Sequence, residues 1–170
     1  LNTLFGEGYE LTVKKYLMGR EFASDEFVTL VGPSLKAIEK VRVLGPVRSA
    51  SQVEISRTDA YVLKVSPPVR ESGKTEGSAP ITIIGPKGVV TLKEGLIIAN
   101  RHIHMSLEDG EKFGVKDNDY VDVDAYSERR TRFFDVQVRV HKNFRLEMHL
   151  DTDDANAAGL KNGSKVSIVK

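Results

Sequence analysis

An internal repeat of 45 residues most constrains the fold of this chain. Residues 104–123 match residues 149–168: each copy has a histidine, an acidic segment, a turn and an alternating apolar stretch. Ser106 and Asp151 stand where a short helix would need its N-cap, and a glycine such as Gly114 is a typical helix stop. The repeat therefore predicts two copies of a helix–turn–strand unit.

The rest of the chain consists of short alternating or apolar segments bounded by Gly, Pro or Ser, a pattern typical of strands. Short helical turns are expected at residues 33–38 and 56–59, and residues 71–77 form a loose loop, a candidate mobile flap. The expected strands are residues 9–16, 27–31, 40–44, 52–55, 60–65, 81–84, 88–92, 96–99, 121–125, 131–140, 146–150 and 165–169.

A second, weaker repeat links residues 43–46 with residues 83–86. Two repeat systems and many short strands favour closed sheets. We therefore expect a mainly β fold of two small β-barrels capped by short helices, with a metal site at their junction. The first barrel is expected over residues 1–100, with a hairpin insertion near 8–26, and the second over 101–170.

Residues 1–6 look like the end of a helix with its glycine stop, as in residues 112–114. We therefore expect the N-terminal part of the native protein to be missing here, and with it the N-terminal strand of the second barrel. An encapsulation or targeting segment would be lost in the same way.

The amino-acid composition of the chain argues against several classes of function. The net charge is +1, from 25 basic and 24 acidic residues, which argues against electrostatic binding of nucleic acid. The chain has no Cys, so disulfides and thiolate metal ligands are excluded, as fits a cytoplasmic protein. No apolar run approaches the roughly 20 residues that span a bilayer, and no membrane partner is expected.

His102 and His104 stand two residues apart after an apolar, strand-prone run. On a strand both imidazoles would point to one face, which is how a strand offers two nitrogen ligands to one metal ion. The repeat aligns His104 with His149, which makes His149 the natural third ligand. Three histidines with an open fourth position are typical of a catalytic zinc site. His141 has no counterpart in the repeat, and we interpret it as a surface residue.

A second polar cluster surrounds Arg48 and Glu54. Arg48 follows a Gly-Pro turn, where its planar guanidinium could bind a phosphate with two hydrogen bonds. Glu54 lies between Val53 and Ile55, so on a strand it faces the opposite way from both, as an ordinary solvent-facing residue would.

Taken together, residues 45–48, 52–60, 100–106 and 147–157 resemble the PduL-type phosphate propanoyltransferases, the phosphotransacylases of bacterial microcompartments. The order and spacing of these segments agree over nearly the whole chain. The resemblance implies two β-barrels with a dinuclear zinc site between them. It also implies exchange of the coenzyme A thiol for phosphate on a short acyl group.

By that resemblance, His102, His104 and His149 hold one zinc, and Arg48 binds phosphate as a catalytic residue. The other zinc would be held by Glu54 together with a second His-x-His that precedes the first helix. The sequence departs from the family here, because that second motif is not present. We therefore expect two zinc ions in the complete protein and about one in this chain, which would then transfer acyl groups very slowly.

The expected reaction converts acyl-CoA and phosphate into acyl phosphate and CoA, and it runs in both directions. Propanoyl-CoA is the expected acyl donor. Neither Cys nor a Ser in a nucleophile-elbow context offers a covalent nucleophile, so direct transfer is the simpler hypothesis. Two alternatives remain open: a zinc hydrolase of similar site geometry, and a non-catalytic double-psi-like barrel that binds partners. Further partners left open are a second copy of this chain in a homo-oligomer and the shell or core enzymes of a microcompartment. The protein is expected in the cytoplasm or inside a microcompartment.

Overall fold

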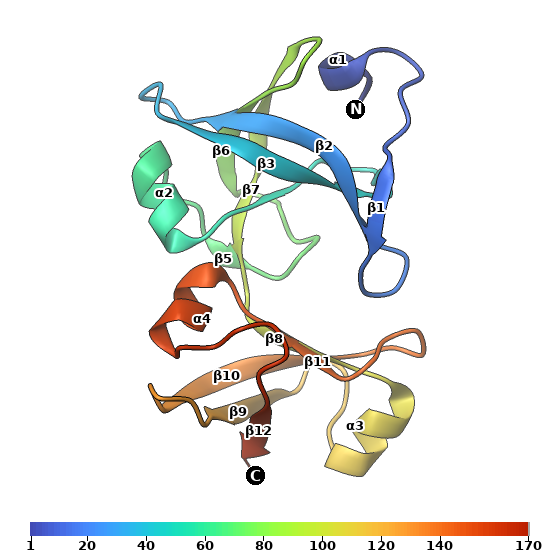
Figure 1. The fold of residues 1–170 in the computed structure, drawn as a ribbon, viewed down its shortest axis with the longest axis vertical. Coiled ribbons are helices and arrows are strands. Elements are labelled where there is room, and N and C mark those ends of the chain that lie inside the picture. The colour runs from blue at the N-terminus through green and yellow to red at the C-terminus, as the bar shows by residue number, and fades with distance from the viewer. Residues whose placement is uncertain (170) are drawn as a thin grey trace. The chain divides into compact units, whose positions relative to one another are not determined.

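A computed structural model describes residues 1–169, and these form two compact units, unit 1 (Leu1–Ala99) and unit 2, which begins at Asn100. Each unit has its own sheet and helices (Figure 1), and each has its own hydrophobic core. Unit 1 contains α1 (Asn2–Phe5), β1 (Val13–Tyr16), β2 (Phe22–Val31), β3 (Ala37–Gly45), β4 (Val53–Glu54), α2 (Arg57–Leu63), β5 (Val69–Arg70), β6 (Ala79–Ile84) and β7 (Val89–Ala99). Unit 2 contains β8 (His102–Met105), α3 (Leu107–Phe113), β9 (Tyr120–Ala125), β10 (Thr131–Val140), β11 (Glu147–His149), α4 (Thr152–Ala157) and β12 (Val166–Val169).

Unit 1 is built on a seven-stranded sheet in the order β1-β2-β6-β7-β4, with β3 added to β2 and β5 added to β7. The long strands pair antiparallel, whereas the two-residue strands β4 and β5 run parallel to β7. Apolar side chains from the sheet and from α2 meet in one core, which includes Leu30, Ile55, Leu63, Ile81 and Leu96.

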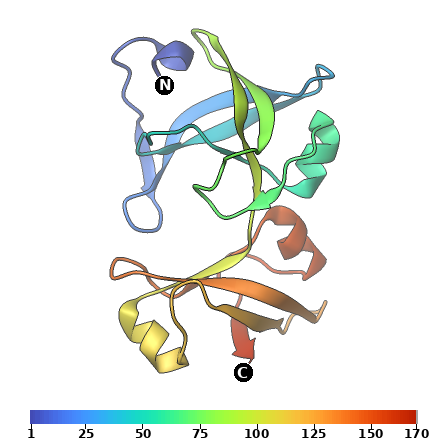
Figure 2. The ribbon, with the colours of Figure 1, turned by 180° about the vertical axis from the view of Figure 1, so that it is seen from behind.

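Unit 2 is built on a five-stranded sheet in the order β11-β8-β10-β9-β12. The strands pair antiparallel except β8 and β10, which run parallel. Its core includes Ile103, Met105, Val123, Val136 and Val138. Figures 1 and 2 show α3 in yellow and α4 in red, well apart in the unit.

The 45-residue repeat takes the form that the sequence predicts. β8, α3 and β9 form the first copy, and β11, α4 and β12 form the second. Ser106 caps α3 by accepting a hydrogen bond from Asp109 N at 3.1 Å, and Asp151 caps α4 by accepting one from Asp154 N at 2.8 Å. Helix α3 ends at Gly114, whose left-handed backbone (φ 65°) suits glycine. The mainly β fold class is confirmed.

Two local predictions were wrong. Residues 60–65 were expected as a strand, but residues 60–63 belong to α2, because Ser56 and Asp59 form a capping box that starts a helix before the β-prone residues. Residues 33–38 were expected as a helical turn. They instead form a tight turn, in which Leu35 N donates to Gly32 O at 3.0 Å, followed by the start of β3.

Other strand boundaries also differ. The strands expected at 88–92 and 96–99 are one strand, β7, that continues through Gly95 (φ 131°). The Gly95 N–H donates to the buried Ser78 Oγ at 2.7 Å, so the hydrogen bonding continues where the register shifts. The loop at 71–77 is tied at both ends, since Gly73 N donates to Gln52 Oε1 and Gly77 N donates to Glu94 Oε2. Within the described residues, no helix has the length and apolar character needed to cross a membrane.

Candidate metal centre

Strand register brings the three predicted histidines to one face of the sheet in unit 2. His102 and His104 lie two residues apart on β8, so their side chains share a face. β11 pairs antiparallel with β8 and places His149 directly opposite His102. Residues that oppose one another in an antiparallel pair also share a face, so all three imidazoles converge.

The three rings are close enough to bind one ion. Their ring centroids lie 4.7 Å (His102–His104), 5.0 Å (His102–His149) and 4.6 Å (His104–His149) apart. One nitrogen from each ring can be chosen such that all three nitrogens lie within 4.8 Å of one another. Within residues 1–169, this is the one group of three or more His, Asp or Glu side chains with such geometry.

His104 is the most enclosed of the three histidines. Its side chain is buried, and neither Nδ1 nor Nε2 has a hydrogen-bond partner among the described residues. The Phe144 ring stacks on the imidazole at 4.2 Å and covers it with an apolar surface. Burial, followed by the charges of His102, His149 and Arg139, lowers the pKa of His104 from 6.5 to about 3. The imidazole is therefore neutral, as a metal ligand must be.

Each of the other two histidines has a hydrogen-bond partner at one ring nitrogen. His102 Nδ1 lies 2.8 Å from Asn100 O, which can only accept, so Nδ1 carries a proton. His149 Nε2 lies 3.1 Å from Glu147 Oε1. Metal-binding histidines are usually oriented in this way, by a carbonyl or carboxylate at the nitrogen that does not bind the ion.

The donor set therefore fits a divalent metal ion. Three neutral imidazoles are the ligand set of catalytic zinc, and buried imidazole nitrogens without partners are costly unless something binds them. The cluster could hold a metal ion, and its chemistry does not single out one metal. All three ligands belong to unit 2, and the placement of the site at a junction stays a prediction.

Unit 1 contains the other predicted site residues in one polar network. Gln52 Nε2 donates to Glu54 Oε1 at 2.5 Å and to Ser72 Oγ at 2.9 Å, and Arg48 Nη1 donates to the same Ser72 Oγ at 3.3 Å. Arg48 also forms an ion pair with Glu21. The structure thus joins Arg48 to Glu54 through two polar side chains, although β4 contributes only Val53 and Glu54 as a strand.

Comparison with known proteins gives the family of the chain. A sequence profile of phosphate propanoyltransferases matches residues 1–161. A phosphate propanoyltransferase of Lachnoclostridium phytofermentans is 60% identical over 98% of this chain and 78% of its own length. One from Thermotoga maritima is 57% identical over 100% and 81%, and one from Priestia megaterium is 51% identical over 96% and 75%.

The chain belongs to the phosphate propanoyltransferase family. The family identified from the sequence, and with it a phosphate acyltransferase, is therefore confirmed. The histidine cluster and the Arg48–Glu54 network are the two groups of predicted site residues that the structure brings together.

Sequence reasoning missed two members of the network, Glu21 and Ser72. Both contact Arg48, from positions 27 and 24 residues away along the chain, and no local pattern marks them. Gln52 belongs to the segment expected as a polar cluster, although no role was predicted for it; it lies two residues before Glu54 and so shares its face of an extended strand. His141 is exposed, as expected, and its Nδ1 accepts from Asn143 N at 3.2 Å.

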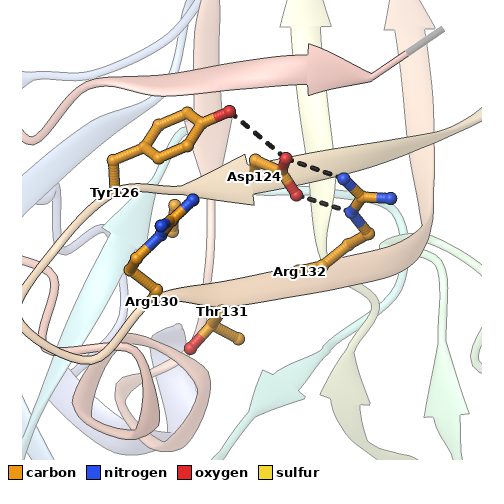
Figure 3. Close-up of a pocket in the computed structure, with 6 residues that line it drawn as sticks. Asp124, Tyr126, Arg130, Thr131 and Arg132 are labelled. Atoms are coloured by element: carbon orange, nitrogen blue, oxygen red, sulfur yellow. Dashed lines mark hydrogen bonds and ion pairs between the residues drawn. The ribbon is translucent and has the colours of Figure 1, made fainter.

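A separate pocket lies on the β9–β10 hairpin (Figure 3). Arg132 donates to both carboxylate oxygens of Asp124, at 2.6 and 2.8 Å, and the Tyr126 hydroxyl donates to the same carboxylate. The hydrogen bond from Arg132 lowers the pKa of Asp124. The Arg130 guanidinium lies 5.4 Å from the centre of the Tyr126 ring. Because these groups pair with one another, we interpret the pocket as part of the hairpin structure.

Proposed function

We propose that this protein catalyses acyl-CoA plus phosphate giving acyl phosphate plus CoA, in both directions, with zinc bound by His102, His104 and His149. Membership of the phosphate propanoyltransferase family supports the reaction. The observation that carries the zinc proposal is the buried His104, whose two ring nitrogens have no partner among the described residues.

Zinc held by this cluster would supply a Lewis acid that draws electron density from an oxygen or sulfur atom of the substrate. The three histidines would hold the ion as neutral ligands. The hydrogen bond from His102 Nδ1 to Asn100 O leaves Nε2 as the ligand nitrogen of that ring. Phe144, stacked on His104, excludes water from one side of the ligand set.

We assign phosphate binding to Arg48. Its planar guanidinium matches phosphate geometry, and a positioned phosphate loses less entropy when it attacks the thioester carbon. The C–S bond then breaks as the new C–O bond forms, and CoA leaves as the thiolate. The Ser72 hydroxyl contacts Nη1 of Arg48 and restrains its side chain.

Glu54 is our candidate ligand for a second zinc. Among residues 1–169, no second group of three ligand-type side chains surrounds it, so this chain is expected to bind about one zinc. Gln52 orients the Glu54 carboxylate with a hydrogen bond of 2.5 Å. Microcompartment association and homo-oligomerisation stay predictions.

The test is a CoA-release assay with acetyl-, propanoyl- and butanoyl-CoA and phosphate, on protein of measured metal content. We expect phosphate-dependent CoA release that falls when zinc is removed and returns when zinc is added. Release of CoA without phosphate would instead support the zinc hydrolase. Protein that neither retains zinc through dialysis nor releases CoA would support the non-catalytic binding module.

A further inference from the structure

Glu147 shares the face of the sheet on which the histidines meet. The β8–β11 register places it directly opposite His104, and it lies two residues before His149 on the same strand. Its Oε1 lies 3.1 Å from His149 Nε2, and Arg145 Nε donates to its Oε2 at 3.3 Å. The carboxylate is thus held by an arginine on one side and contacts a predicted metal ligand on the other.

This contact decides which nitrogen of His149 is left to bind a metal. An ionised carboxylate can only accept a hydrogen bond, so Nε2 must carry the proton of the neutral ring. The lone pair is then at Nδ1. In His102 the roles are reversed, because Nδ1 donates to the backbone oxygen of Asn100 and leaves Nε2 with the lone pair.

We propose that Glu147, held by Arg145, is a positioning residue that fixes the tautomer and the ring orientation of His149, so that Nδ1 faces the metal. The part of this inference that concerns metal binding rests on the proposed function. Residues in this position raise the basicity of the ligand, and their loss usually lowers metal affinity 10- to 100-fold.

The competing explanation is an ordinary surface ion pair. The side chains of Glu147 and His149 are 46% and 36% exposed, and exposed pairs contribute little to stability. Exposure also weakens the proposed effect, so we expect a loss of affinity near the tenfold end of the range. A mere surface pair would leave the tautomer of His149 free to change with no effect on metal binding.

The first experiment measures the tautomers in metal-free protein, by the ¹⁵N chemical shifts of the imidazole nitrogens at pH 8, above the ordinary pKa of histidine. We expect His149 as the Nε2–H form in the wild type and a mixture of tautomers in Glu147→Ala. His102 serves as the internal control and should keep its Nδ1–H form in both proteins, which also shows that β8 is intact. An unchanged His149 tautomer in Glu147→Ala would overturn the proposal.

The second experiment measures the affinity for Co²⁺ and its absorption spectrum. Glu147→Ala should weaken binding about tenfold, and Glu147→Gln should weaken it less, because the amide oxygen can still accept from Nε2. Glu111→Ala, on the exposed side of α3, is the matched control and should change nothing. A change in the coordination number of Co²⁺ in Glu147→Ala would also overturn the proposal, since Glu147 would then be a ligand itself.

Failure of this inference and failure of the proposed function are distinguishable. The tautomer measurement needs neither metal nor activity. If His149 has the predicted tautomer but the protein releases no CoA, the positioning role stands and the acyl-transfer proposal falls. If CoA release depends on zinc but the tautomer does not depend on Glu147, only the positioning role is lost.

Discussion

At the scale of single residues, His104 is the side chain whose environment makes least sense without a ligand. A buried polar atom without a hydrogen bond costs about 1–3 kcal/mol, and both ring nitrogens of His104 are in that position among the described residues. A core chosen for stability alone would have an apolar side chain here, between Ile103 and Met105. The proposed role as a metal ligand would explain why a histidine occupies this position.

This explanation predicts opposite effects of His104→Leu with and without metal. Metal-free protein should be as stable as the wild type or more stable, by about 1 kcal/mol, because the unsatisfied nitrogens are gone. The stabilisation by added zinc should disappear. Urea unfolding with and without zinc measures both effects, with the exposed His141→Ala as the control. A variant that is much less stable without metal, yet still stabilised by zinc, would contradict the metal role of His104.

Arg48 gives the second prediction at this scale. Arg48→Lys keeps the charge but loses the bidentate geometry, so the KM for phosphate should rise about tenfold while the KM for acyl-CoA changes little. Arg130→Lys, in the separate hairpin pocket, is the matched control and should leave both constants unchanged. Steady-state kinetics with each substrate varied in turn make the comparison. Equal increases in both constants would indicate that Arg48 only supports the structure around Glu21 and Ser72.

At the scale of helices and strands, local sequence patterns predicted the helix ends, because helix caps and stops depend on residues close together in the chain. The caps at Ser106 and Asp151 and the stop at Gly114 were legible because their partners lie within a few residues. The pairing of β11 with β8, which brings His149 to His102, is a contact between distant segments. Only the repeat indicated it, by aligning His149 with His104. No repeat in the sequence connected Ser72 or Glu21 with Arg48.

Helix α2 shows how a local cap overrides strand propensity. Residues 60–65 contain aromatic and β-branched side chains, yet Ser56 and Asp59 exchange hydrogen bonds at 3.1 and 3.3 Å and start a helix before them. We predict that Ser56→Ala lowers the free energy of unfolding by about 1 kcal/mol. Chemical denaturation measures this value. A neutral result would mean that burial of Ala60 and Leu63, and not the cap, determines the helix.

The segment before β1 is tied to β2 by Glu26, which predicts a pH dependence of stability. The buried Glu26 carboxylate accepts hydrogen bonds from the Tyr9 hydroxyl and the Thr12 N–H. Desolvation alone would raise its pKa, but hydrogen bonds, those from Thr12 and Ser24 foremost, lower the pKa from 4.5 to about 2. The folded state therefore binds this proton less readily than the unfolded state. The contribution to stability is complete above about pH 4.5 and is lost as the pH falls towards 2.

Glu26→Gln tests this dependence. The variant should be less stable than the wild type at pH 7, by about 2 kcal/mol, because hydrogen bonds to a buried charge are among the stronger ones. The difference should shrink between pH 4.5 and pH 2, where the wild-type carboxylate becomes protonated. Urea unfolding at several pH values gives the two curves, and a constant difference between them would exclude Glu26 as the source.

At the scale of the whole molecule, each unit has its own core and contains some of the predicted site residues. The histidine cluster belongs entirely to the unit that begins at Asn100, whereas Arg48 and Glu54 belong to Leu1–Ala99. Because all the cluster's ligands come from β8 and β11, a metal ion there would bind the folded form of one sheet and not its unfolded chain. Bound metal should therefore stabilise unit 2 against unfolding and have little effect on unit 1.

Hydrogen exchange with and without zinc tests this expectation. At a free zinc concentration about 100 times Kd, binding stabilises the folded state by about 2.7 kcal/mol. Exchange that requires the unfolding of unit 2 should then slow about 100-fold in β8, β10 and β11. β2 and β6 belong to the sheet of unit 1 and contribute none of the three histidines, so exchange that requires only local unfolding there should change little.

His149→Ala, which removes one ligand, should abolish the protection in unit 2. Equal protection of both sheets by zinc would show that the units unfold together. Protection that persists in His149→Ala would mean that the metal binds somewhere other than the histidine cluster.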